Sequence, residues 1–229
     1  MNEYDELTAS IATTSSDYRF PDPRDRMNEE RVRRWVEQFP EGAQLDLLRE
    51  FDHVLSECYV SEEDAVEFLK VVAKNHKFTD GQLGEYWGRC NFLDLQQQGS
   101  SQGDLLELYG QILNDEFGLD LDACGSLDGD AIYLDDAIHS GLRVGNDLDP
   151  WIRLDAEPGT RLRIVVLATH TYGTYRMRQR LEGVSVEAEK QLDISIWRAV
   201  EFENRRARRR VSAVYWPAEI PDEPRCSDQ

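Results

Sequence analysis

Residues 131–143 read AIYLDDAIHSGLR, and this stretch decides the fold class. Its first four residues are apolar and suit a buried strand, and two adjacent carboxylates, Asp135 and Asp136, follow. A small-residue turn, Ser140-Gly141, then leads into a helical pattern. A strand that ends in polar residues and continues through a turn into a helix is the unit from which parallel α/β sheets are built.

The second half of the chain repeats this alternation of strand, loop and helix. We expect further strands at 91–95, 119–124, 161–169 and 192–196, and helices at 104–117, 170–181 and 197–211. The apolar run at 164–167 is typical of a strand that is buried on both faces. The sequence therefore predicts an α/β fold with a Rossmann-like, mostly parallel sheet.

The first half of the chain has a different character. Residues 1–23 show no stable period and end at Pro21-Asp22-Pro23, so we expect a mobile tail. Apolar residues at helical spacing predict helices at 25–39, at 43–58 and from Ser61 onward. We therefore expect a helical N-terminal region at 24–88, an α/β domain at 89–216 and a C-terminal tail at 217–229.

The charge balance excludes several classes of protein. The chain has 26 Lys and Arg against 45 Asp and Glu, a net charge of −19, which is wrong for a bare nucleic-acid binder. No stretch approaches the roughly 18 apolar residues of a membrane span. The acidic N-terminus lacks the features of a secretion signal, and the four cysteines are widely spaced, so we expect a cytoplasmic protein without a membrane partner.

The acidic pair and the turn after it suit a sugar phosphate. Carboxylates accept hydrogen bonds from vicinal ribose hydroxyls. The N-terminus of a helix presents backbone N–H groups and a partial positive charge to a phosphate. The alternative is a strand that merely ends in a polar loop, since paired acids are common in an acidic protein.

Two further segments are expected at the same edge of the sheet. The strand near residue 93 leads into QQQGSSQ at 96–102, where Gly99, Ser100 and Ser101 precede a helix and no Lys or Arg occurs. His170 follows the strand at 161–169, where it could act as an acid or base or line a pocket for a base, or be an ordinary loop histidine.

The segment Asp135–Arg143 resembles the signature of the phosphoribosyltransferases, an acidic pair followed by two apolar residues and a phosphate-cradling Thr-Gly. The resemblance implies that Asp135 and Asp136 contact the ribose hydroxyls and Mg²⁺ and carry the chemistry. It also implies that Ser140 and Gly141 hold the 5′-phosphate, and that Gly99, Ser100 and Ser101 hold the diphosphate. His139 and Arg143 depart from the signature, where Thr is usual; Arg143 could donate to the phosphate or exclude it by bulk.

Over roughly residues 25–215 the chain is similar to the phosphoribosyltransferase-like effectors of bacterial conflict systems. These proteins are associated with antiphage loci, including some retrons. The resemblance implies a defence effector that binds a phosphoribosyl compound or nucleotide. Its partners would be a reverse transcriptase and its DNA product, or another defence protein.

Other readings of the function stay open. The chain could be a ligand-sensing or interaction module that has lost the chemistry, which the absence of cations at 96–102 favours. It could also be a structural partner in a larger complex. The arginines between Arg198 and Arg210 suit ordinary helix pairs with Glu201, or a local contact with nucleic acid.

Overall fold

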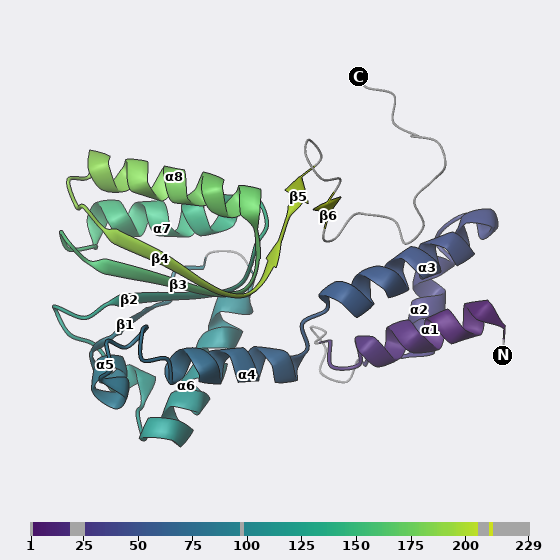
Figure 1. Cartoon of the computed structure of the whole chain (residues 1–229), viewed down its shortest axis with the longest axis horizontal. Helices are drawn as coiled ribbons and strands as arrows, with labels where there is room; N and C mark the ends of the chain where they lie inside the picture. Colours follow the sequence, from purple (N-terminus) through teal and green to yellow (C-terminus); the bar gives the residue numbers. More distant parts are fainter. Residues whose placement is uncertain (1, 19–25, 97–98, 206–210, 213–229) are drawn as a thin grey trace. The chain divides into compact units, whose positions relative to one another are not determined.

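A computed structural model describes residues 2–18, 26–96, 99–205 and 211–212 (Figure 1). The described chain separates into two compact units. One contains the residues up to Glu62 together with those from Glu203, and the other is Glu63–Phe202. The two units are described separately below.

The helices of the first unit are α1 (Glu3–Thr14), α2 (Glu29–Val36) and α3 (Glu41–Cys58). Their apolar faces enclose a small core of buried side chains: Ile11, Ala12, Val32, Val36 and Leu48. Helix α1 lies where the sequence predicts a mobile tail. It forms because Asn2 caps its first turn, accepting a hydrogen bond from Asp5 N at 2.9 Å, and because Ile11 is fully buried against the other helices.

The second unit is a sheet of four parallel strands in the order β1-β2-β3-β4. The strands are β1 (Asn91–Leu93), β2 (Ala131–Ile138), β3 (Arg161–His170) and β4 (Asp193–Phe202). Helices α6 (Ser101–Phe117), α7 (Leu142–Leu154) and α8 (Thr171–Glu187) connect them in turn. This arrangement confirms the predicted α/β fold with a Rossmann-like parallel sheet.

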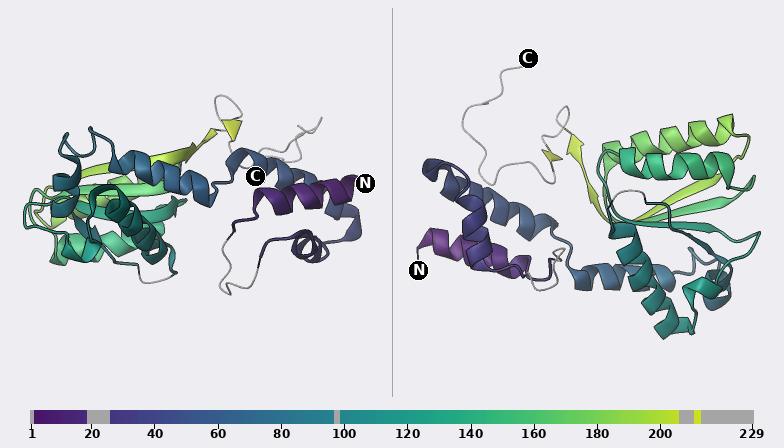
Figure 2. Two further views of the ribbon diagram at one scale, coloured as in Figure 1. Left: turned by 90° about the horizontal axis from the view of Figure 1, so that it is seen from below. Right: turned by 180° about the vertical axis from the view of Figure 1, so that it is seen from behind.

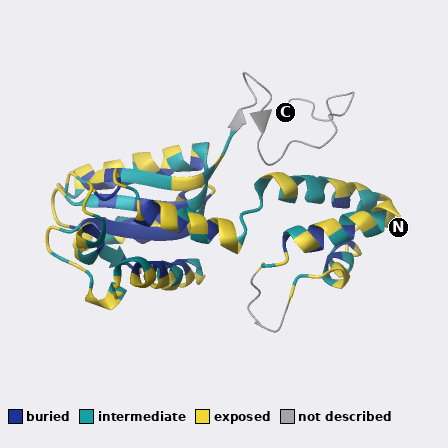
Figure 3. Cartoon of the chain, turned by 60° about the horizontal axis from the view of Figure 1, so that its bottom comes forward, coloured by how far each residue is buried: buried dark blue, intermediate teal, exposed yellow. Residues whose placement is uncertain are grey.

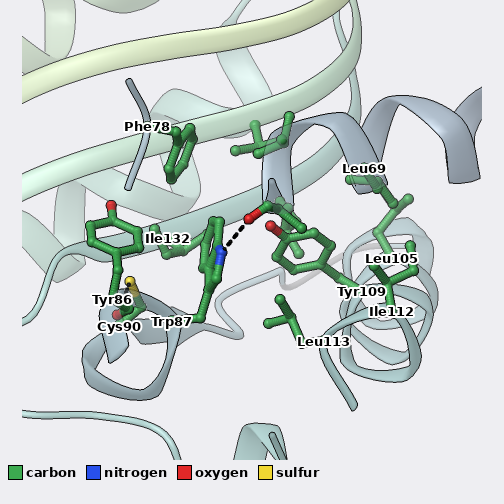
Figure 4. Close-up of a cluster of buried hydrophobic side chains, with 14 residues drawn as sticks. Leu69, Phe78, Tyr86, Trp87, Cys90, Leu105, Tyr109, Ile112, Leu113 and Ile132 are labelled. Atoms are coloured by element: carbon green, nitrogen blue, oxygen red, sulfur yellow. Dashed lines mark hydrogen bonds between the residues drawn. The ribbon is translucent and has the colours of Figure 1, made fainter. Parts of the chain in front are cut away.

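The helix expected from Ser61 onward and a further helix that was not expected pack with the sheet. Helices α4 (Glu62–Ala73) and α5 (Leu83–Arg89) pack on the sheet through one core cluster that also contains Phe78, Trp87 and Ile132 (Figure 4). Trp87 is fully buried, and its Nε1 donates a 2.8 Å hydrogen bond to the carbonyl of Ala73, which ties α5 to α4. The two compact units meet between Glu62 and Glu63.

Two expected elements have a different structure. The strand expected at 119–124 is instead a short 3-10 helix, η1 (Leu121–Ala123), which Asp120 caps by accepting from Asp122 N. The helix expected at 197–211 is wrong, because β4 continues to Phe202 in register with β3. A short antiparallel pair, β5 (Asn204–Arg205) with β6 (Val211–Ser212), follows in the first unit, and residues 206–210 lie outside the described part of the chain.

The helices cover opposite faces of the sheet (Figures 1 and 2). Side chains of α6 pack with Ile132 and Leu134, whereas α7 and α8 pack with Tyr133, Ile164 and Val166. Alternate residues of a strand point to opposite faces, so α6 lies on one face and α7 and α8 lie on the other. Figure 3 shows the buried strands between helices whose outer faces are exposed.

This layering fixes the position of a ligand crevice. The connections β1-α6-β2 and β2-α7-β3 both move to the next strand in the same direction, but they cross opposite faces, so their crossovers have opposite hands. The chain leaving β1 and the chain leaving β2 therefore run to opposite faces of the sheet. In open α/β sheets, ligands bind beyond the carboxyl ends of strands at such a switch point.

Candidate functional site

The acidic pair lies at this switch point, in the C-terminal half of β2. The side chain of Asp135 is fully buried and that of Asp136 is half-exposed. Asp135 Oδ1 accepts a 3.0 Å hydrogen bond from Ser101 Oγ, at the start of α6. This bond joins the loop after β1 to the end of β2, so the structure brings together two segments that the sequence places 34 residues apart.

Arg143 contacts both members of the pair. Its Nη2 lies 2.9 and 3.0 Å from the two carboxylate oxygens of Asp135 and 2.6 Å from Asp136 Oδ1. Arg143 is the second residue of α7 and directly follows the tight bend after β2, whose Gly141 is the N-cap of the helix. The sequence interpretation directed this guanidinium to a phosphate, and in the structure its Nη2 is held by the carboxylates.

The electrostatics of the acidic pair follow from the burial of Asp135. Removal of Asp135 from water, together with the nearby charge of Asp136, raises the pKa of Asp135 to about 6. The guanidinium of Arg143 opposes this shift. The site therefore combines two acidic side chains, one of them fully buried, with a single guanidinium.

The turn at 139–141 forms a hollow at the N-terminus of α7. A cavity of about 220 Å³ is lined by residues of this turn and of the elements on either side of it: Asp136, Ala137, Ile138, His139, Ser140, Gly141, Arg143 and Val144. Ser140 Oγ accepts from Leu142 N at 3.3 Å, and Gly141 is the N-cap. The expected phosphate residues Ser140 and Gly141 thus lie together at a helix N-terminus, which favours an anion.

The turn at 139–141 needs two glycines. Gly141 has φ +75°, a conformation that side chains disfavour, and a Cβ there would lie 2.5 Å from the carbonyl oxygen of Gly173. Gly173 sits in the first turn of α8, and a Cβ on it would lie 1.8 Å from the carbonyl oxygen of His139. Sequence reasoning did not identify Gly173, because the contact joins a turn and a helix that are remote in sequence.

The loop at 96–102 is shaped by glutamines. The side chain of Gln102 is fully buried; its Oε1 accepts from Leu95 N at 2.6 Å and Gln96 N at 2.8 Å, and its Nε2 donates to Leu134 O at 3.2 Å. Gln96 Oε1 accepts from Gln102 N, and Gln96 Nε2 donates to Ser101 Oγ. These bonds fix the ends of the loop and leave Gly99 and Ser100 exposed.

Sequence reasoning also missed that the side chain of Gln102 holds the loop after β1 in place. A glutamine in a run of polar residues gives no local signal that it will be buried. Residues 97 and 98 of this loop lie outside the described part of the chain.

His170 caps α8 at the end of β3. Its Nδ1 accepts a 3.3 Å hydrogen bond from Tyr172 N. Within residues 99–205 of the described chain, no hydrogen bond joins His170 to the acidic pair. The ring therefore lies at the expected edge of the sheet, and its contact in the structure is the helix cap.

The residues present do not form a protein cage for Mg²⁺. Among the described residues, no group of three or more His, Cys, Asp or Glu side chains is placed to hold a metal ion. The two carboxylates that the sequence assigns to Mg²⁺ are already bridged by Arg143. The magnesium role stays a prediction of the sequence, and the geometry fits a guanidinium better than a divalent ion.

Comparison with protein families shows which family the chain belongs to. The family model PRTase-CE matches residues 32–228. The chain belongs to the PRTase-CE family. No curated protein and no solved structure matches it.

Membership of PRTase-CE, a phosphoribosyltransferase-type family, supports the resemblance read from residues 135–143. The matched range contains the whole sheet and all the site residues described above. In the described part of the PRTase-CE chain, no helix is both long and apolar enough to cross a membrane.

Proposed function

We propose that the chain binds a phosphoribosyl compound or nucleotide at the carboxyl edge of β1 and β2. The observation that carries this proposal is the hydrogen bond from Ser101 Oγ to Asp135, which joins the two loops that match the phosphoribosyltransferase pattern. Membership of a phosphoribosyltransferase-type family supports the assignment of such a ligand to this edge of the sheet.

Each group at the edge has a proposed role. The exposed carboxylate of Asp136 accepts hydrogen bonds from the ribose hydroxyls, with Asp135 buried behind it. Ser140, Gly141 and the N-terminus of α7 receive the 5′-phosphate.

The remaining residues would face the 1-substituent of the ribose. Gly99, Ser100 and Ser101 would line the side from which a diphosphate or other 1-substituent extends. His170, with the exposed ring of Tyr172, would face a base, since both lie at the end of β3. In an active enzyme, the bond that changes is the one at the anomeric carbon.

A non-catalytic sensor is the second candidate. A diphosphate leaving group needs cations to neutralise its charge, and residues 96–102 contain no Lys or Arg. Gln96, Ser101 and Gln102 are already hydrogen-bonded within the loop or to β2. These contacts support ligand binding without turnover.

The resemblance noted in the sequence supports a biological role in antiphage defence. We propose a cytoplasmic effector whose partner is a reverse transcriptase with its DNA product, or another defence protein. Phage protection by the complete system, with and without Asp136→Asn, tests this role. Full protection by a variant that no longer binds ligand would refute a role of the ligand site in defence.

Isothermal titration calorimetry tests the binding site. The probes are ribose 5-phosphate, nucleoside 5′-monophosphates and phosphoribosyl pyrophosphate, and the variant is Asp136→Asn. Asp128→Asn is the matched control, because Asp128 is an exposed carboxylate at the opposite end of β2. We expect Asp136→Asn to weaken binding about tenfold or more, as the loss of a charge-assisted hydrogen bond does.

Absence of heat for every probe, or equal weakening by both variants, would overturn the proposed function. A separate assay of pyrophosphate release distinguishes the two candidates. Release that depends on Asp136 supports the enzyme, and binding without release supports the sensor.

A further inference from the structure

We infer that Arg143 is the resident cation of this site, and that the site takes a ribose 5′-monophosphate without a divalent metal. The ligand part of this inference rests on the proposed function, whereas the cation part rests on the geometry of Arg143 alone. The two parts are tested separately below.

The first observation is that one nitrogen bridges both carboxylates. Nη2 of Arg143 lies within 3.0 Å of three oxygens from Asp135 and Asp136. A divalent cation held by paired carboxylates would occupy the same space and compensate the same charges. Guanidinium and metal therefore exclude one another at this position.

The second observation is that burial holds Arg143 in place. The Asp135 side chain is 0% exposed, while the Arg143 side chain is 42% exposed. Moving the guanidinium away would leave a buried carboxylate without its cation, and that is costly. Arg143 therefore stays on the pair when a ligand binds.

The third observation concerns the other edge of the same guanidinium. Only Nη2 of Arg143 is engaged by the described residues, so the N–H groups on Nη1 and Nε are available. Arg143 also lines the 220 Å³ hollow at the N-terminus of α7. One guanidinium can thus neutralise the acidic pair with Nη2 and donate to a phosphate in the hollow with its remaining groups.

The fourth observation limits the number of phosphates. The hollow has a helix N-terminus and a guanidinium for one phosphate group, whereas the loop at 96–102 has no cation. A diphosphate on the anomeric carbon would lie against that uncompensated loop. Ribose 5-phosphate and nucleoside 5′-monophosphates are therefore the ligand class that the charges of the site suit.

A metal titration tests the cation part without any organic ligand. Free Mn²⁺ is measured by electron paramagnetic resonance against the full chain and its variants Arg143→Gln and Asp135→Asn/Arg143→Gln. We expect Arg143→Gln to bind Mn²⁺ at least about tenfold more tightly than the wild type, and the double variant to lose that gain.

Arg153→Gln is the matched control, because Arg153 also bridges two carboxylates, those of Asp149 and Glu187, on the surface. We expect it to bind Mn²⁺ as the wild type does. If the wild type itself binds Mn²⁺ and Asp135→Asn abolishes that binding, the inference is overturned, even if Arg143→Gln does not fold.

Calorimetry with ribose 5-phosphate tests the ligand part, in Mg²⁺ and in EDTA. We expect wild-type affinity to agree within about twofold between the two buffers, and phosphoribosyl pyrophosphate with Mg²⁺ to bind no more tightly than ribose 5-phosphate. A tenfold loss in EDTA would refute metal-independent binding. If ribose 5-phosphate fails in both buffers while the Mn²⁺ result holds, the proposed function fails and Arg143 remains the resident cation.

Discussion

Replacement of Gln102 by leucine should open the loop after β1. The side chain of Gln102 is 0% exposed, accepts from two backbone N–H groups and donates to Leu134 O. Leucine has a similar size and can make none of these three bonds. A net contribution of about 1 kcal/mol for each bond gives a loss of about 3 kcal/mol, and access of water to the half-buried Leu95 and Gln96 reduces this to about 2 kcal/mol.

Urea unfolding, followed by circular dichroism, measures this loss as a shift of the midpoint at constant slope. Hydrogen exchange adds a local readout, because the amides of Leu95 and Gln96 should lose protection in Gln102→Leu. Gln111→Leu is the matched control, since Gln111 is exposed on the same helix. A loss for Gln102→Leu below about 0.5 kcal/mol, or unchanged protection of the two amides, would refute the reasoning.

Two further predictions concern the same edge of the sheet. Gly173→Ala should lower the free energy of unfolding by about 3 kcal/mol or more in a thermal or urea melt, because its Cβ would lie 1.8 Å from His139 O. The control is Gly183→Ala on the same helix, which meets no atom within 4 Å and should be neutral or slightly stabilising. Equal effects of the two variants would contradict the close approach. The folded chain binds a proton on Asp135 that the unfolded chain has lost between about pH 4 and pH 6, because the pKa of Asp135 is raised to about 6. The contribution of Asp135 to the free energy of unfolding is therefore present at low pH and falls by up to about 3 kcal/mol as the pH rises through 6. In Asp135→Asn, the urea midpoint should change less with pH over that range than in the wild type. The same pH dependence in the variant would contradict the assignment to Asp135.

In this member of the PRTase-CE family, two features of the candidate site differ from the phosphoribosyltransferase signature. Arg143 stands where the family signature usually has Thr, and it neutralises the acidic pair. Gln102 and Gln96 hold a loop that contains no cation. The described cation at the acidic pair is thus one guanidinium, and the hollow beside it lies at the N-terminus of α7.

Much of the sheet unit follows from local sequence. The apolar run before Asp135, the valine-rich run at 164–167 and the glycine turns between them predict parallel strands with intervening helices, because each pattern reports on the burial of its own segment. The position of Asp135 and Ser140 at one strand end follows as well, since both belong to one continuous stretch. The sequence alone therefore determined the fold class and the placement of Asp135 and Ser140 near the carboxyl end of one strand.

Contacts between remote segments were decided only by the tertiary structure. Residues 197–202 carry charges at helical spacing, but pairing with β3 makes them a strand. Gln102 is buried because the backbone of the loop after β1 and of β2 offers it three partners, and Gly173 is required because His139 passes against it. Arg143 reaches the acidic pair because the first turn of α7 places its guanidinium over the end of β2. Hydrogen bonds and close approaches of this kind depend on how the chain is brought together in space, which spacing along the sequence does not encode.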